Sequence, residues 1–441
     1  MNKFLFKHID NTGLVLWRVI FGLLISIEAF GAIATGWVRR TLVEPDFTFN
    51  FIGFEFIQPL PGDGMYYYFV LMGLFGVLVM LGYKYRFSMF CYALMWTFVY
   101  LMQKTSYNNH YYLMMLLCWL MVFLPAHRRL SLDTKFKPSS KSISAARWTY
   151  LVVILQVWLV YTFGSIAKWY PDWIDGTVVA LFMKGKMDYW LIGDFLQLEW
   201  VHYSIVYAGI LFDLLIVPLL LWKRTRLFGF IISVFFHLFN SIVFQIGIFP
   251  YMSMAFALFF FSSEVLQKRF IMKKELYTAG EIIVPNYKPL LIGVFSVYFM
   301  IQLGLPLRHW AFQDDVLWTE EGHRLSWRMM LRSKNGLLTI YTEDKETGER
   351  NNYDYRKLLS KKQYHSVKAK PDLIWQLVQR IEQLEAKKGK DVAVYTVTRV
   401  KVNGGEYFPL IDPKVDLAAE PWRPFRHHDW ILPSPEDYHH K

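Results

Sequence analysis

Nine long apolar stretches fill most of the first 305 residues, and they restrict the fold more than any other feature of the sequence. A helix needs about 20 apolar residues to cross the hydrocarbon core of a bilayer, and it pairs all of its own backbone polar groups there. The sequence therefore predicts a helical membrane bundle of about nine spans, with a range of eight to ten because the fourth and eighth stretches are short. The stretches are residues 13–33, 65–82, 87–104, 111–125, 148–167, 203–222, 227–243, 249–262 and 289–305.

Charged residues divide the chain into two unlike parts. Residues 306–441 hold 23 Lys/Arg and 20 Asp/Glu, whereas residues 1–305 hold only 25 and 16. The density of charged residues in residues 1–305 is far below that of a soluble domain. We therefore predict a transmembrane helical domain at residues 1–305 and a small soluble α+β domain at residues 306–441. The soluble part has strand patterns at residues 324–333, 337–342, 392–402 and 406–411, and a helix pattern at residues 371–386.

Basic residues gather in alternate loops between the apolar stretches. With a cytoplasmic N-terminus, 18 of them lie in cytoplasmic segments and 5 outside, which is the bias that membrane proteins follow. We therefore predict an integral membrane protein with a cytoplasmic N-terminus and an extracytoplasmic C-terminal domain. Arg18 and Glu28 interrupt the first stretch, which is unlike a cleaved signal sequence. Basic residues scattered between spans also argue against a nucleic-acid partner.

Ionisable side chains inside the spans are the best candidates for function, because a charge in hydrocarbon is costly and is usually kept for function or pairing. Arg18 has a structural alternative, as a partner of Asp213 or Glu28. Lys104 begins a polar run, residues 104–110, between two spans. Burial lowers the pKa of a lysine, and a neutral lysine can act as a general base. Alternatively, Lys104 extends to the membrane interface.

A second polar group consists of His237, Asn240, Ser241 and Gln245, whose spacing places them on one helical face. Such a face can line a polar cavity or bind neighbouring helices by hydrogen bonds. Familiar phosphate-loop, dinucleotide, zinc-protease and serine-hydrolase motifs are missing from the sequence. Cys91 and Cys118 both lie in apolar stretches, so we expect no disulfide framework and no metal site.

Several motifs together resemble the vitamin K-dependent γ-glutamyl carboxylases, and the similarity extends over most of residues 10–432. The most specific motif is Gln-Lys-Thr-Ser-Tyr-Asn-Asn-His at residues 103–110. The others are residues 16–22, 59–61, 126–129, 163–168 with Asp172 and Trp173, 236–241, 246–249, 326–330, and 412–416 ahead of Trp422.

This resemblance implies an enzyme that uses vitamin K hydroquinone, reduced from menaquinone or phylloquinone. The hydroquinone is deprotonated and reacts with O2, and the product removes a γ-proton from a peptide glutamate, which then takes up CO2 while the quinone leaves as its epoxide. A dry membrane cavity would suit both the quinone tail and a strong base. One alternative is hydroquinone epoxidation without protein carboxylation. Another is a transporter or lipid-binding protein without enzyme activity.

The resemblance also implies roles for individual residues. Lys104 is the expected base for the hydroquinone, with Asn109 and His110 beside it. Further candidates are Asn108, Tyr107 and Ser241 for quinone binding, His237 and Asn240 for the facing wall, and Arg18 and Lys168 for the glutamate carboxylate.

Expected partners are the lipid bilayer, a quinone, a Glu-containing peptide or protein and a quinone-epoxide reductase system for recycling; no metal is expected. The animal enzymes have a further C-terminal region that this chain lacks, so the resemblance does not decide whether a propeptide is recognised. The compact form points to a bacterial inner membrane.

Overall fold

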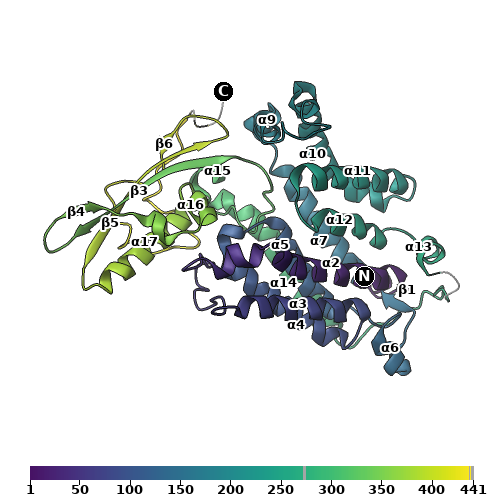
Figure 1. The fold of residues 1–441 in the computed structure, drawn as a ribbon. Coiled ribbons are helices and arrows are strands. Elements are labelled where there is room, and N and C mark those ends of the chain that lie inside the picture. The colour runs from purple at the N-terminus through teal and green to yellow at the C-terminus, as the bar shows by residue number, and fades with distance from the viewer. Residues whose placement is uncertain (272–274, 437, 439–441) are drawn as a thin grey trace.

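The computed structural model describes residues 1–271, 275–436 and 438. Its helices form a bundle, and the C-terminal strands lie beyond one end of that bundle (Figure 1). Each of the nine predicted stretches contains helix. The helices are α2 (Thr12–Ala34), α3 (Gly64–Leu81), α4 (Tyr85–Met102), α5 (Asn109–Phe123), α7 (Trp148–Ile166), α10 (Glu199–Leu221), α11 (Arg226–Phe244), α12 (Phe249–Ala255) with the short helix η5 (Phe256–Phe259), and α14 (Lys288–Leu307).

Six helices in the described part of the chain are long and apolar enough to cross a membrane, namely α2, α3, α7, α10, α11 and α14. Helix α5 and the α12–η5 pair are apolar but shorter. The 11 residues from Phe249 to Phe259 rise roughly 17 Å as a helix, about half the thickness of the hydrocarbon core. Nine is therefore an approximate count, as the short fourth and eighth stretches already suggested.

Loops that we expected on the same side of the membrane contact each other. On one side, β1 (His8–Asp10) pairs antiparallel with β2 (Ser144–Ala146). On the same side, Lys7 and Ile282 form an isolated antiparallel β-bridge. On the other side, the backbone N–H of Lys104 donates to Phe49 O at 2.7 Å. These contacts gather the loops at the two ends of the bundle.

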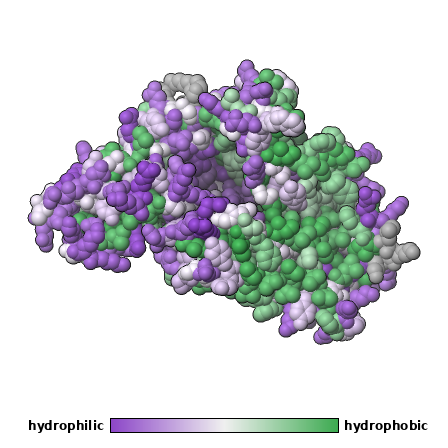
Figure 2. Space-filling view, viewed as in Figure 1, coloured by the Kyte–Doolittle hydropathy of each residue, from purple (hydrophilic) through white to green (hydrophobic). Residues whose placement is uncertain are grey.

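Helices α2 and α3 approach each other closely because small residues face each other. A Cβ on Gly22 would lie 2.4 Å from the backbone N of Met80, and a Cβ on Gly76 would lie 2.5 Å from Ser26 Oγ. Association of helices in a membrane depends on such close packing, since lipid is as apolar as the side chains. Hydrophobic residues cover the bundle surface, whereas the C-terminal part is mainly hydrophilic (Figure 2).

The C-terminal part contains one antiparallel sheet, in the order β4-β3-β5-β6. The strands are β3 (Lys334–Asp344), β4 (Arg350–Asn352), β5 (Val392–Val402) and β6 (Phe408–Pro409). Helix α17 (Pro371–Ala386) buries Leu373, Leu377 and Ile381 in the core that it shares with the sheet. The predictions for residues 371–386 and 392–402 are confirmed. Shorter helices precede them, α15 (Val316–Thr319) and α16 (Lys361–Val367).

The strand predicted at residues 324–333 is wrong. Residues 319–333, here called the plug segment, begin at the last residue of α15 and then enter the top of the bundle without regular structure. Leu325, Trp327 and Met330 have positive φ angles of 61°, 57° and 50°, a conformation that a strand cannot contain. Trp327 is fully buried in the core of the bundle, where its ring stacks on Tyr112 with centroids 4.8 Å apart. Burial of this large side chain outweighs the strand-like sequence pattern.

Arg18 does not pair with Asp213 or Glu28, so that expectation is also wrong. Its Nη2 donates to Leu130 O at 2.6 Å, and its guanidinium packs against Gly82. Leu130 follows the end of α5, whereas residues 104–108 precede its start. The 15 residues of α5 therefore separate Arg18 from Lys104 by roughly 22 Å along the bundle.

We predict that Gly82→Ala destabilises the protein more than Gly62→Ala. Both glycines have a left-handed backbone, with φ of 65° and 59°, but a Cβ on Gly82 would lie 1.6 Å from Arg18 Nη1 whereas Gly62 faces open space. The left-handed penalty of about 1 kcal/mol is common to both, and overpacking adds about 2 kcal/mol at Gly82. Thermal unfolding in detergent measures the difference; equal midpoints for the two variants would contradict the contact with Arg18.

Candidate functional site

Three cavities lie where the C-terminal part meets the helices, and the plug segment contributes to all of them. The molecular surface is visibly hollowed in this region (Figure 2). The polar cavity, of about 210 Å³, is lined by Lys104, Arg324 and Asp372 among others. The outer cavity, of about 650 Å³, includes Arg328. The apolar cavity, of about 350 Å³, includes Met329 and Met330.

Lys104 lies in the polar cavity and is paired with a carboxylate. It follows α4 in a short helical turn, η2 (Lys104–Ser106), and its side chain is almost fully buried. Its Nζ lies 2.6 Å from Asp372 Oδ2, at the start of α17. Burial lowers the pKa of Lys104 from its usual 10.5 to about 8, although Asp372 opposes the shift. A lysine with this pKa and this partner is mostly protonated at pH 7.

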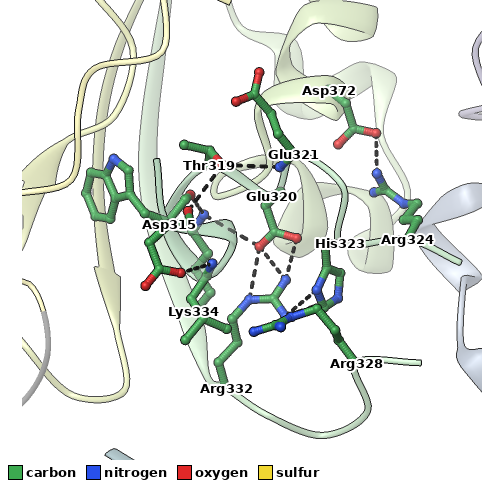
Figure 3. Close-up of polar contacts among 12 residues, drawn as sticks. Asp315, Thr319, Glu320, Glu321, His323, Arg324, Arg328, Arg332, Lys334 and Asp372 are labelled. Carbon is green, nitrogen blue, oxygen red and sulfur yellow. Dashed lines mark hydrogen bonds and ion pairs between the residues drawn. The ribbon is translucent and has the colours of Figure 1, made fainter. Parts of the chain in front are cut away.

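Asp372 binds a second cation from the plug segment. Arg324 Nη1 lies 2.6 Å from the same Oδ2 atom (Figure 3), while the buried Oδ1 accepts no hydrogen bond from the described residues. Burial alone would raise the pKa of Asp372, but Arg324 and Lys104 together lower it to about 2. One carboxylate thus joins the helical bundle to two elements of the C-terminal part. Breaking such a buried pair leaves an uncompensated charge.

A further ionic group holds the base of the plug segment. Glu320 accepts hydrogen bonds from Arg332, and Lys334 Nζ lies 3.5 Å from Glu320 Oε1 (Figure 3). Burial would raise the pKa of Glu320, but Arg332 and Lys334 hold it well below its usual value. These charges neutralise one another and join the plug segment to the start of β3 at Lys334.

The rest of the polar run 104–110 mostly ties the bundle to the plug segment. Tyr107 OH donates to Asn109 Oδ1 at 2.8 Å and accepts from the backbone N–H of Leu325 at 2.7 Å. Asn109 Nδ2 donates to Arg328 O at 3.0 Å. Asn108 caps α5 through a bond from the backbone N–H of Tyr111. Neither Asn108 nor Tyr107 lines any of the three cavities.

The apolar cavity brings together His110, His237, Asn240 and Lys168 from three distant parts of the sequence. The His110 ring stacks on Phe249 with centroids 4.0 Å apart. His237 Nε2 lies 3.1 Å from Tyr161 OH, while its buried Nδ1 has no hydrogen-bond partner in the described structure. Ser241, one position beyond Asn240, turns away from this cavity and lies 3.2 Å from Tyr251 OH.

Lys168 and Asp213 form the charged pair of the apolar cavity. Lys168 Nζ donates to Asp213 Oδ2 and, at 3.0 Å, to Gly164 O. It also lies 5.7 Å from the centroid of the Trp173 ring. Asp213 comes from α10, and Lys168 directly follows α7. Both charged residues are visible in the sequence, but their ion pair is not, because they are 45 positions apart.

The predicted site is therefore divided between two cavities. Lys104 belongs to the polar cavity with Asp372 and Arg324, whereas His110, His237, Asn240 and Lys168 surround the apolar one. Arg18 lines neither. Among residues 1–271, 275–436 and 438, no group of three or more His, Cys, Asp or Glu side chains is placed to hold a metal ion.

Comparison with known protein families finds two matches. The family model described as HTTM domain matches residues 6–264. The model described as vitamin K-dependent gamma-carboxylase, lumenal domain, matches residues 287–437. No solved structure matches the chain.

We predict that Asp372→Asn destabilises the protein by about 3 kcal/mol, because two buried cations lose their shared counter-charge. The wild-type carboxylate has a pKa of about 2, below its usual 3.8, so its contribution is complete above about pH 4 and is lost as the pH falls towards 2. Thermal unfolding at pH 7 tests the change.

The matched control for this substitution is Asp391→Asn, which removes the exposed pair with Lys345. Exposed pairs contribute less than about 1 kcal/mol. Equal unfolding midpoints for the two variants would show that Asp372 does not hold the two parts together.

Proposed function

Because the chain belongs to the HTTM domain family, and a vitamin K-dependent carboxylase lumenal domain follows in the same chain, we propose that it is a membrane-embedded γ-glutamyl carboxylase. The proposed reaction converts vitamin K hydroquinone, O2, CO2 and a peptide glutamate into the quinone epoxide, γ-carboxyglutamate and water. The protein is an integral membrane protein, as its apolar helices and the HTTM domain indicate.

The apolar cavity is the observation that carries this proposal. A naphthoquinone with an isoprenoid tail needs an apolar site with a few polar groups for its two oxygens. The cavity walls are mainly Phe, Trp, Val, Ile and Met side chains. Two buried polar atoms of these walls, His237 Nδ1 and Trp173 Nε1, have no hydrogen-bond partner in the described structure. Buried polar groups normally have partners, so both atoms suit a ligand that supplies them, and the residues fit the quinone.

When bound, the hydroquinone would supply, with O2, the base that removes the glutamate γ-proton. The protein must first accept a proton from the hydroquinone hydroxyl. Lys168 is the residue that we propose for this step. Transfer of one proton from Lys168 Nζ to Asp213 Oδ2 along their hydrogen bond leaves a free amine beside the cavity, and a positioned amine can act as a general base. The apolar walls exclude the water that would protonate a carbanion.

Lys104 is less suited to this role than the sequence suggested. Like Lys168, it is paired with a carboxylate, that of Asp372. It lines the polar cavity, however, whose walls also contain Arg308, Glu320 and Glu321, and not the apolar cavity that we propose for the quinone. We propose that Lys104 positions the plug segment through Asp372 and Arg324. The motif that it begins would then hold the cavity wall in place, with His110 as its one member at the apolar cavity.

The charge bias of the loops supports a cytoplasmic N-terminus and an extracytoplasmic C-terminal part. We propose a bacterial inner membrane as the location. Because each turnover would convert hydroquinone to epoxide, continued activity needs a quinone-epoxide reductase as partner.

The first test uses the purified protein in nanodiscs with vitamin K hydroquinone, O2, labelled bicarbonate and a Glu-rich peptide. We expect epoxide and fixed label in the peptide together. Epoxide without label, across several Glu-containing peptides, would reduce the proposal to an epoxidase. Absence of both products from folded protein would reject an enzymatic role for the apolar cavity.

A second prediction separates the two lysines. Lys168→Ala should lower epoxide formation by about 100-fold or more, the usual contribution of a general base, and a small amine should partly restore it. Lys184→Ala, at an exposed lysine nearby, should have no effect. Full epoxidation by Lys168→Ala, with loss of epoxidation and amine rescue in Lys104→Ala, would return the role of base to Lys104.

A further inference from the structure

Arg328 is a cation of the plug segment that forms no close ion pair with the described residues. No carboxylate oxygen of the described residues lies within 4.0 Å of its guanidinium nitrogens, and its buried Nε makes no hydrogen bond. Figure 3 shows Arg332 paired with Glu320, and Arg324 with Asp372, but no ionic partner at Arg328. A guanidinium without an ion pair in a partly buried position is costly. Burial and then the neighbouring Arg332 lower the pKa of Arg328 to about 10, although Asp315 opposes the shift.

The backbone and ring neighbours of Arg328 hold it in this position. Its carbonyl accepts a hydrogen bond from Asn109 Nδ2 at 3.0 Å. His309 Nδ1 lies 2.7 Å from Pro306 O and must donate to it, because a carbonyl only accepts. In neutral His309, Nε2 is then an acceptor, and it lies 3.5 Å from Arg328 Nη1. This weak contact orients the guanidinium without neutralising it.

The outer cavity gives Arg328 access to the exterior. The cavity measures about 650 Å³, and Trp169 and Trp310 line it with 64% and 67% of their surfaces exposed. Asp314, on the same wall, already accepts from the backbone N–H and the hydroxyl of Ser434. Asp315 accepts from the backbone N–H of Leu317. The guanidinium is therefore the group of this cavity that most needs an anion.

A thin wall separates the outer cavity from Lys168. Ala167 lines the outer cavity, and the next residue, Lys168, lines the apolar one. Likewise, Arg328 lines the outer cavity and Met329 the apolar one. A Cβ on Gly164 would lie 3.3 Å from Met329 Cε and 3.2 Å from Asp213 Oδ2, so the Met329 methyl lies beside the Lys168–Asp213 pair. A carboxylate at Arg328 would thus lie across this wall from the Lys168–Asp213 pair.

We propose that the outer cavity receives a glutamate side chain of a peptide, and that Arg328 binds its γ-carboxylate. Arginine suits this role because its planar guanidinium forms two parallel hydrogen bonds to one carboxylate. The exposed rings of Trp169 and Trp310 would contact the peptide at the cavity mouth. This inference rests on the proposed carboxylase function and adds the substrate site that the apolar cavity lacks.

An acidic peptide fits this cavity better than the phosphate of an anionic lipid. Arg328 lies in the plug segment, which belongs to the C-terminal part, and the walls include Asp314, Asp315 and Val316 from the same part. A side chain on an extended peptide can enter from outside.

The test measures binding separately from turnover. The full protein in zwitterionic nanodiscs is titrated with a Glu-containing peptide and with the same peptide carrying Gln. We expect the wild type to bind the Glu peptide about tenfold or more tightly, as for a desolvated charge pair. Arg328→Gln should remove this preference, and Arg328→Lys should retain part of it. Arg356→Gln, at an exposed arginine of the C-terminal part, should bind as the wild type does.

Each outcome has one interpretation. An unchanged Glu preference in folded Arg328→Gln would overturn the proposal, as would equal binding of both peptides by the wild type. If the wild type shows no Glu preference, and anionic lipid in the nanodiscs weakens peptide binding in the wild type but not in Arg328→Gln, the site would be assigned to a lipid phosphate instead. Epoxide formation in the same samples reports on the carboxylase function independently. A Glu preference without epoxide would retain the carboxylate site and reject the reaction, and epoxide without a Glu preference would do the opposite.

Discussion

The buried contact of Lys104 and Arg324 with Asp372 is the interaction on which the rest of the site depends. Lys104 belongs to the loop before α5, Arg324 to the plug segment and Asp372 to α17, so one carboxylate links three elements. Charges removed from water hold their partners strongly, because separation would leave each one unsolvated. This link sets the depth at which residues 319–333 enter the bundle. It thereby sets where Trp327 packs and which side chains close the cavities.

The polar and the apolar cavity differ in how many charged groups line them, because charges are costly inside a bilayer. Charged groups are held in the polar cavity, where the C-terminal part supplies counter-charges, whereas the apolar cavity has one ion pair, Lys168 with Asp213, among mainly apolar walls. A site of this second kind can bind an apolar ring and protect a reactive base. The proposed substrate site at Arg328 belongs to the outer cavity, and the next residue, Met329, lines the apolar one.

Local patterns predicted the helices, α17 and β5, because the periodicity of apolar residues decides which face is buried. They failed at residues 324–333, where burial of Trp327 overrides the strand pattern. The membership of the site was partly visible: His237 and Asn240 share a helical face, and Lys168 ends a recognisable motif. Its partners were not, because Asp213 and Asp372 approach their lysines only through tertiary packing. No pattern in one sequence encodes a contact between residues 45 or 268 positions apart, as Lys168–Asp213 and Lys104–Asp372 are.

The plug segment also bears on how such a protein can be assembled from modules. Two neighbouring methionines of this segment, Met329 and Met330, complete a cavity whose other walls belong to the helical bundle. Without the plug segment, the wall of the apolar cavity that Met329 and Met330 form would be missing. A gene fusion that joined these helices to a different domain would keep the spans and Lys168. It would nevertheless leave the apolar cavity open to water.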